Sequence, residues 1–163
     1  MFGKLKNLFS SSGIAVAAPV SGTVVPLSEV PDPTFSQGIL GPGAAVQPSE
    51  GRIVAPANGT VDMMFDTGHA VSMTTSEGAE LLIHVGIDTV NLKGEHYTAK
   101  CKSGDTVRKG DTLIEFDLDA IKAAGYEVVT PIIVCNPDVF ASLKTEGAGG
   151  IQAGDTLLTL EKK

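Results

Sequence analysis

Residues 80–90 have the sequence ELLIHVGIDTV, a short apolar run interrupted by one histidine, His84. Gly86 and the Asp-Thr pair that follows it suit a turn, so we expect a mostly buried strand that ends near this glycine. Side chains alternate across a strand, which places Leu82, His84 and Gly86 on one face. The glycine leaves open space beside the imidazole for a ligand, a phosphate or a partner protein. A histidine seen alone is more often a core residue that hydrogen-bonds a carbonyl group.

A second histidine, His69, stands in a similar setting. Residues 66–68 are Asp-Thr-Gly and predict a turn, and an alternating strand follows over residues 69–73. Residues 75–78 predict another turn, so the two strands pair as a hairpin that can set the imidazoles side by side. Such a pair indicates either a metal site or a phosphoryl site with one acceptor and one hydrogen-bond donor.

Composition favours one all-β domain over residues 14–163. The chain of 163 residues is long enough to bury a core, and its 19 Gly and 9 Pro predict short strands and tight turns. The net charge of −7 argues against a nucleic-acid partner and would steer a basic protein surface toward this chain. Cys101 and Cys135 form no spaced motif, and no membrane span or signal peptide is evident. We therefore expect a soluble, cytoplasmic protein with reduced thiols.

Repeated turn–strand units predict the architecture. The pattern Ala-Pro-x-x-Gly-Thr-Val occurs at residues 18–24 and 55–61, and Gly-Asp-Thr occurs at residues 104–106, 110–112 and 154–156. Each unit is a turn that leads into a strand. We therefore expect a β-sandwich or flattened barrel with an internal pseudo-repeat. The aspartates and threonines of these units are interpreted as turn residues.

Two or three short helices should accompany the strands. Asp117 can cap a helix that Gly125 ends, and Asn136-Pro137 is expected to start another that continues through Lys144. Residues 126–135 predict a strand, and Pro131 within it indicates an edge strand or a bulge.

Two segments outside the hairpin are candidates for binding. Residues 29–43 contain three prolines and three glycines, so we expect a long loop packed over the sheet, either a partner-binding rim or a cover for a sheet edge. We expect residues 1–13 to be a flexible N-terminal segment. Its first nine residues place apolar side chains at helical spacing beside two lysines. This segment is either a weak, peripheral membrane anchor or a frayed terminus without a role.

The residues near the two histidines limit which kinds of catalytic or binding site they can form. A catalytic zinc site needs three protein ligands; His69, His84 and Asp88 would be a minimal set, but no His-x-His and no glutamate base stand with them. No serine-hydrolase elbow and no nucleotide-binding glycine motif is present. A phosphohistidine site needs fewer residues than a catalytic zinc site, because one histidine can accept the phosphoryl group without a separate general base. Neutral imidazole is a good nucleophile, and the second imidazole with backbone N–H groups after Gly86 could hold the phosphate.

These residues resemble a known family. Residues 81–90 are similar to the active-site stretch of the glucose-class enzyme IIA of the bacterial phosphoenolpyruvate:sugar phosphotransferase system. Residues 67–70 resemble its second histidine segment, residues 30–35 its docking loop and residues 110–117 a further segment. The resemblance runs from about residue 14 to the end and implies an antiparallel β-sandwich. It also implies a transferase-class component, a phosphoryl carrier with a phosphohistidine intermediate.

The resemblance assigns roles to individual residues. His84 would accept the phosphoryl group from the phosphocarrier HPr and pass it to a cysteine on the IIB domain of a sugar permease. His69 would hydrogen-bond the phosphate, Thr67 would orient His69, and Asp88 would lie beside the site. The resemblance also implies an apolar docking face: Phe35, Ile39, Phe65, Leu82 and Val90.

The family further implies regulatory partners. In some members the unphosphorylated form also binds metabolic enzymes and permeases, in one case with a zinc ion between the two histidines and a partner's carboxylate, and the targets implied here are of the kind of glycerol kinase, permeases and adenylate cyclase. No cofactor is required beyond the transient phosphate on His84. Two positions depart from the family: Val85 replaces a common phenylalanine, and Gln37 replaces an acidic residue in the docking loop.

Two other classes of protein share parts of this pattern. Residues 107–113 resemble lipoyl and biotinyl carrier domains, but the Met-Lys-Met or Asp-Lys-Ala hairpin that displays their modified lysine does not occur. A zinc endopeptidase of the lysostaphin type has a related β-fold, but its His-x-His motif is missing.

Overall fold

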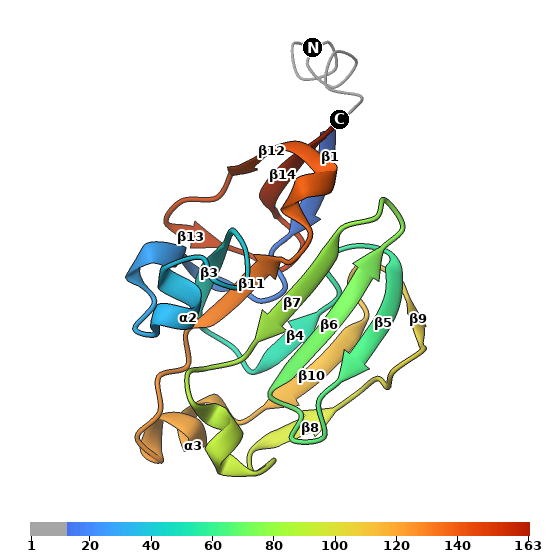
Figure 1. Cartoon of the computed structure of the whole chain (residues 1–163). Helices are drawn as coiled ribbons and strands as arrows, with labels where there is room; N and C mark the ends of the chain where they lie inside the picture. The colour runs from blue at the N-terminus through green and yellow to red at the C-terminus, as the bar shows by residue number, and fades with distance from the viewer. Residues whose placement is uncertain (1–12) are drawn as a thin grey trace.

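The computed structural model describes residues 13–163, and short antiparallel strands make up most of its regular secondary structure (Figure 1). The segment expected over residues 1–13 lies outside the described residues, except that Gly13 is the first residue of strand β1. The strands of the first half are β1 (Gly13–Ala17), β2 (Gly22–Pro26), β3 (Gly43–Pro48), β4 (Arg52–Val54), β5 (Gly59–Met64), β6 (Ala70–Thr75) and β7 (Glu80–His84). Those of the second half are β8 (Tyr97–Ala99), β9 (Thr106–Val107), β10 (Thr112–Phe116), β11 (Thr130–Val134), β12 (Phe140–Thr145), β13 (Gly150–Ile151) and β14 (Thr156–Lys162).

Helices are short and lie at the ends of strands. They are α2 (Pro33–Ser36) and α3 (Leu118–Ala123), together with the 3₁₀ turns η1 (Leu27–Glu29), η2 (Thr89–Leu92) and η3 (Pro137–Val139). The expected helix after Asp117 is confirmed, since the Asp117 carboxylate accepts a hydrogen bond from the backbone N–H of Ala120. Gly125 has a φ of 92°, a conformation that glycine adopts without strain. No helix within residues 13–163 is long and apolar enough to cross a bilayer.

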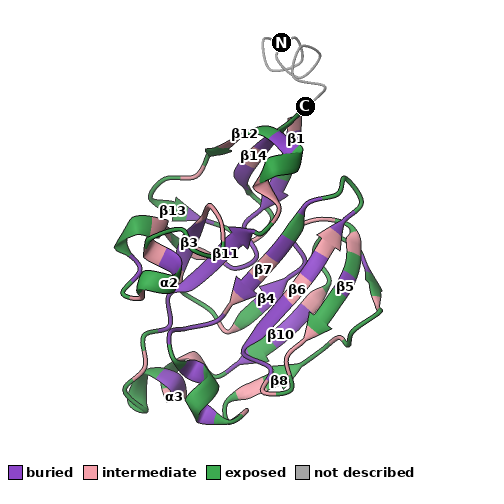
Figure 2. Ribbon diagram, viewed as in Figure 1, coloured by how far each residue is buried: buried purple, intermediate pink, exposed green. Residues whose placement is uncertain are grey.

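Three antiparallel sheets enclose the core. The large sheet has the order β13-β2-β3-β11-β7-β6-β5-β9, and the smaller ones have the orders β1-β14-β12 and β4-β10-β8. In Figure 1, β4 and β10 lie behind β7, β6 and β5. Ile53 and Leu113 come from the rear layer, and Met73 and Ile83 from the front layer. All four side chains are fully buried and belong to one apolar cluster, and Figure 2 shows buried residues along β4, β6, β7 and β10. The expected antiparallel β-sandwich is confirmed.

The two Ala-Pro copies exchange equivalent hydrogen bonds. The N–H of Ala17 donates to the carbonyl of Pro56 at 3.1 Å, and the N–H of Val54 donates to the carbonyl of Pro19 at 2.8 Å. Because each copy supports the other in the same way, the repeat in the sequence is also a repeat in the fold. The expected internal pseudo-repeat is confirmed.

The three Gly-Asp turns also share one geometry. In each, the aspartate carboxylate accepts a hydrogen bond from the backbone N–H three residues earlier, which pre-shapes the turn. Asp105 accepts from the N–H of Lys102, Asp111 from that of Arg108, and Asp155 from that of Gln152. These residues are structural, as the sequence indicated.

Residues 136–144 do not form the expected helix. Only Pro137–Val139 make a 3₁₀ turn, and the chain then enters β12, which pairs with β14. Phe140 and Leu143 stand three residues apart, a spacing that suits a helix face. A bulge between Phe140 and Ser142 adds one residue to the strand, so this spacing also fits one face of a strand.

Strand β11 is an internal strand, so the prediction of an edge at Pro131 was wrong. It lies between β3 and β7 in the large sheet. Pro131 pairs with Ala45 of β3, whereas pairing with β7 begins only at Ile132. Proline has no N–H to donate, and it lies just outside the paired stretch of β11 and β7, opposite the end of β7.

Candidate active site

The two histidines meet at one end of the β6–β7 hairpin. Ala70 is paired with His84 across this hairpin, and His69 immediately precedes Ala70. The two imidazole centroids are 4.9 Å apart and the rings are nearly perpendicular, at 81°. The turn and strand pattern of the sequence therefore predicted this juxtaposition correctly.

A backbone carbonyl fixes the tautomer of His84. Its Nδ1 lies 2.7 Å from the carbonyl oxygen of Gly86. A carbonyl can only accept a hydrogen bond, so Nδ1 carries the proton and donates it. In the neutral ring Nε2 then holds a free lone pair. The His84 side chain is half-buried, so this nitrogen is not sealed inside the protein.

The turn after His84 requires glycine. Gly86 has a φ of 89°, and a Cβ at this position would lie 2.5 Å from Cγ2 of Thr89 and 2.9 Å from the carbonyl oxygen of Glu127. The N–H groups of Gly86 and Ile87 donate to the carbonyls of Val129 and Glu127, at 3.2 and 3.0 Å. Of the N–H groups after Gly86 that were expected to hold a phosphate, that of Ile87 is therefore already paired.

His69 is a buried and neutral imidazole. Its exposed fraction is 3%, and the hydroxyl of Thr67 is hydrogen-bonded to its Nδ1. The ring of Phe65 contacts it edge-on at a centroid distance of 5.6 Å. Burial, and secondarily the nearby His84, lowers the pKa of His69 to about 4. Its ring is thus uncharged at neutral pH, and its Nε2 is the nitrogen that remains for a ligand.

Opposing influences act on His84. Burial lowers the pKa of His84, while the hydrogen bond to Gly86 and the negative charges of Asp32 and Asp88 raise it. Burial is the largest of these influences, so the neutral, nucleophilic form is favoured. Asp88 lies beside the site, as the resemblance implied.

Asp32 is a site residue that the sequence interpretation missed. Its carboxylate accepts the N–H of Thr34 at 2.9 Å and caps helix α2. The signal was present, because Asp followed by Pro at the first helical position is a helix start. The short helix was overlooked because its segment was interpreted as an irregular loop.

Some apolar residues around the histidines are buried and pack beneath the site, whereas others are exposed on the protein surface. Phe35 is 4% exposed, and its ring lies 5.1 Å from that of His84, so it forms a wall of the site. It belongs to a small second core under α2: Val30, Phe35, Ala45, Ile87, Val129 and Ile133. Ile39 and Val90 are 67% and 51% exposed. Leu82 and Phe65 are half-buried.

Tyr97 of β8 contacts the histidine site from a neighbouring sheet. Its hydroxyl donates to the carbonyl of Val85 at 2.8 Å, and its ring lies 6.4 Å from that of His69. Burial raises the pKa of Tyr97 to about 12, so its hydroxyl keeps its proton near neutral pH. Val85 and Tyr97 are twelve positions apart in the sequence, and no local sequence pattern predicts their contact.

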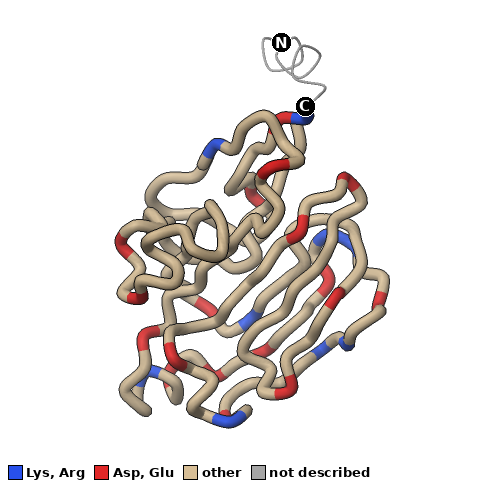
Figure 3. Tube along the Cα trace, in the orientation of Figure 1, with Lys and Arg blue, Asp and Glu red and all other residues tan. Residues whose placement is uncertain are grey.

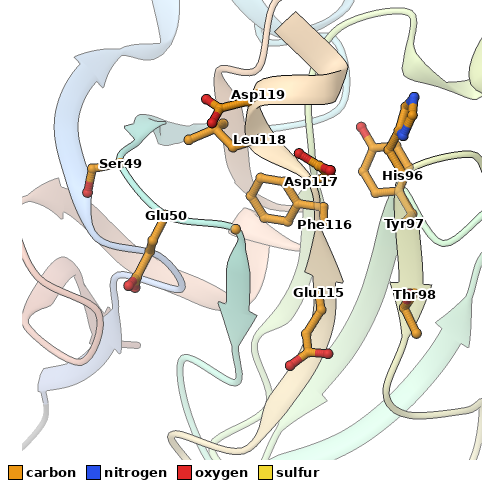
Figure 4. Close-up of a pocket in the computed structure, with 11 residues that line it drawn as sticks. Ser49, Glu50, His96, Tyr97, Thr98, Glu115, Phe116, Asp117, Leu118 and Asp119 are labelled. Carbon is orange, nitrogen blue, oxygen red and sulfur yellow. The ribbon is translucent and has the colours of Figure 1, made fainter.

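His96 lies away from the histidine pair. It lines a surface hollow of about 710 Å³ with Ser49, Tyr97 and four carboxylates (Figure 4). The carboxylates are those of Glu50, Glu115, Asp117 and Asp119. This acidic hollow follows the general excess of acidic over basic residues in the chain (Figure 3).

The two imidazoles are the only metal-binding side chains gathered at this site within residues 13–163, since no group of three His, Cys, Asp or Glu residues is placed to hold an ion there. A catalytic zinc site needs three protein ligands. A zinc ion at His69 and His84 would therefore need a ligand from another molecule, and a zinc peptidase is disfavoured.

Known proteins resemble this chain over most of its length. The family model described as "phosphoenolpyruvate-dependent sugar phosphotransferase system, EIIA 1" matches residues 14–140. A glucose-specific EIIA component of Halalkalibacterium halodurans is 46% identical over 147 residues, which are 90% of this chain and 85% of that protein. The glucose-specific EIIA component of Haemophilus influenzae is 40% identical over 163 residues, covering 100% and 96% of the two chains.

Longer proteins and a solved structure also match. A beta-glucoside-specific EIIBCA component of Bacillus subtilis is 47% identical over 145 residues, 89% of this chain but 24% of that protein. This chain thus spans about a quarter of the length of such relatives. The glucose permease IIA from Mycoplasma capricolum superposes with a TM-score of 0.84 at 32% identity, covering 90% of this chain and 95% of that one.

Replacement of Gly86 tests the required turn. We expect Gly86→Ala to lower the free energy of unfolding by about 2–4 kcal/mol, because positive φ strain and the overlap with Thr89 and Glu127 add together. Gly104→Ala is the matched control, since Gly104 has a φ of 95° and no atom within 4 Å of the added Cβ. It should cost about 1–2 kcal/mol. Urea unfolding measures both, and equal losses would contradict the close approach.

The buried His69 should make stability depend on pH. The pKa is about 4 in the folded chain, against 6.5 for an unperturbed histidine. Between these values the unfolded chain binds more protons, so the free energy of unfolding should fall as the pH drops from about 6.5 to about 4 and then level off. Urea titrations at several pH values should show that His69→Gln loses this part of the pH dependence of the free energy of unfolding. His96→Gln, which changes an exposed histidine, should keep it. Parallel curves for wild type and His69→Gln would contradict the assignment.

Proposed function

We propose that this chain, which belongs to the EIIA 1 family of the phosphoenolpyruvate-dependent sugar phosphotransferase system, carries a phosphoryl group on Nε2 of His84 during sugar uptake. The observation that carries the proposal is the hydrogen bond from Nδ1 of His84 to the carbonyl of Gly86. Because this bond uses the proton on Nδ1, the free lone pair of His84 lies on Nε2, and the imidazole of His69 is next to that ring.

The transfer into the site is a displacement at phosphorus. The donor is a phosphohistidine of the phosphocarrier HPr. The Nε2 lone pair of His84 attacks the phosphorus, the donor's P–N bond breaks, and its electron pair returns to the donor imidazole. Nδ1 keeps its proton throughout. The Gly86 carbonyl stabilises the positive charge that develops on the ring as the new P–N bond forms.

The transfer out of the site reverses these changes. A cysteine thiolate on the IIB domain of a sugar permease attacks the phosphorus, and the electron pair of the P–N bond returns to Nε2 of His84. Relatives named as EIIBCA components contain a segment that matches this chain, which supports a IIB partner. Names of relatives differ in the sugar, glucose or a beta-glucoside, so the transported sugar follows from the membrane partner.

His69 steadies the phosphoryl group. If the Thr67 hydroxyl donates to Nδ1 of His69, the neutral ring carries its proton on Nε2 and can donate it to a phosphoryl oxygen. The low pKa of His69 keeps this ring from acting as a permanent cation that would hold the phosphate too tightly. His69 and Thr67 thus have positioning roles, and His84 bears the covalent bond.

The rim around the site suits docking of protein partners. Ile39 and Val90 expose apolar surface, and Phe65 and Leu82 contribute part of theirs, while Phe35 supports His84 from below. Asp32 and Asp88 add negative charge, which favours a partner with a basic surface. A dry, apolar contact would also protect the labile P–N bond from water.

The unphosphorylated form offers the same face to regulatory targets. Glycerol kinase, permeases and adenylate cyclase are the kinds of partner that the family suggests. A zinc ion between His69, His84 and a partner's carboxylate fits the two neutral imidazoles, and the partner would complete the ligand set. We place these exchanges in the cytoplasm, with any membrane contact through residues 1–9 being peripheral.

Labelling with phosphorylated HPr tests the proposed function. We expect wild type to take up acid-labile, base-stable phosphate, and His84→Gln to take up none because the nucleophile is gone. His69→Gln should still accept phosphate but should fail to pass it to a IIB domain, because the phosphoryl group is no longer held for in-line attack. His96→Gln is the control and should behave as wild type in both steps. Undiminished labelling of His84→Gln would refute the assignment.

A further inference from the structure

The backbone carbonyl of Val85, the residue after His84, is hydrogen-bonded to the side chain of Tyr97, which lies outside both histidine segments. It accepts hydrogen bonds from the hydroxyl of Thr89 at 2.7 Å and from the hydroxyl of Tyr97 at 2.8 Å. The N–H of Val85 donates to the carbonyl of His69 at 2.7 Å. Val85 itself is fully buried. The backbone of this one residue is therefore held on both sides.

The same backbone leads directly to the carbonyl that binds His84. Val85 is bonded to Gly86, whose carbonyl accepts from Nδ1 of His84. Gly86 has no side chain to restrict its rotation, so neighbouring hydrogen bonds must define its conformation. The N–H groups of Gly86 and Ile87 are held by backbone carbonyls, and the Val85 carbonyl is held by two side-chain hydroxyls.

The ring of Tyr97 is itself fixed. It stacks on Phe116 of β10 with a centroid distance of 6.2 Å, and its edge faces His69 at 6.4 Å. Figure 4 shows the Tyr97 and Phe116 rings as neighbours along the wall of the acidic hollow. The hydroxyl therefore reaches the Val85 carbonyl from a rigid support on another sheet, β4-β10-β8.

We propose that Tyr97 is a positioning residue of the phosphoryl site: its hydroxyl holds the Val85 carbonyl so that Gly86 presents its own carbonyl to Nδ1 of His84. Through this chain of contacts Tyr97 sets the tautomer of His84 and the direction of its Nε2 lone pair. The inference rests on the proposed function, because it concerns the orientation of the proposed phosphoryl acceptor. Tyr97 touches neither the phosphate nor the reacting nitrogen.

Tyr97→Phe isolates the hydroxyl, because the stacked ring remains. We expect ¹⁵N NMR of the imidazoles to show His84 shifted toward the tautomer that is protonated on Nε2. The rate of phosphoryl transfer from phosphorylated HPr should fall about threefold to tenfold, the size expected for one lost hydrogen bond. Tyr126→Phe is the matched control, since it makes the same change at the chain's other tyrosine, which is not among the ring contacts of His69 or His84. It should leave both measurements unchanged.

A purely structural tyrosine would give a different result. Tyr97→Phe would then lower the melting temperature but leave the His84 tautomer and the transfer rate of the folded protein at wild-type values, and this would overturn the proposal. Failure of the proposed function is distinguishable, because wild type itself would then take no phosphate on His84.

The route through Val85 can be tested with a second variant. Thr89→Val removes the other donor to the Val85 carbonyl while nearly keeping the side-chain volume. If Tyr97 acts through this carbonyl, the effect of Tyr97→Phe on the His84 tautomer should be larger in the Thr89→Val background than in wild type. Equal effects in the two backgrounds would contradict the route.

Discussion

The carbonyl of Gly86 determines which nitrogen of His84 can react, and much of the surrounding structure serves to hold that carbonyl in place. Nδ1 of His84 donates to it at 2.7 Å, so the lone pair lies on Nε2. The turn that presents it needs a φ of 89° at Gly86 and leaves no room for a Cβ. The segment that leads into strand β11 accepts the N–H groups of the turn through the carbonyls of Val129 and Glu127, which ties the site to the middle of the large sheet.

Burial and charge are balanced around this hydrogen bond. Burial favours the neutral ring of His84, and the Gly86 carbonyl with Asp32 and Asp88 favours the protonated ring. A neutral ring is needed to attack phosphorus, whereas a ring with a P–N bond gains from a carbonyl and carboxylates nearby. In the proposed role of His84, this balance of influences would allow the phosphoryl group to be both accepted and released. A carrier has to do both, unlike an enzyme that ends its reaction with hydrolysis.

The sequence predicted the parts of this arrangement that depend on local patterns. Alternation along residues 80–85, the turns at Gly68 and Gly78, and the repeated Gly-Asp units all formed as expected. The failures involve contacts between distant segments. The strand β12 depends on pairing with β14, and the internal position of Pro131 depends on the pairing of β11 with both β3 and β7. Tyr97 reaches Val85 from another sheet, and its flanking residues gave no sign of this contact.

The most direct measurement is ¹⁵N and ³¹P NMR of the histidine-labelled protein before and after phosphorylation by HPr. The account predicts that His84 alone becomes phosphorylated, with phosphorus on Nε2 and a proton retained on Nδ1 in a hydrogen bond to the Gly86 carbonyl. Phosphorus on Nδ1 of His84, or on His69 instead, would contradict it.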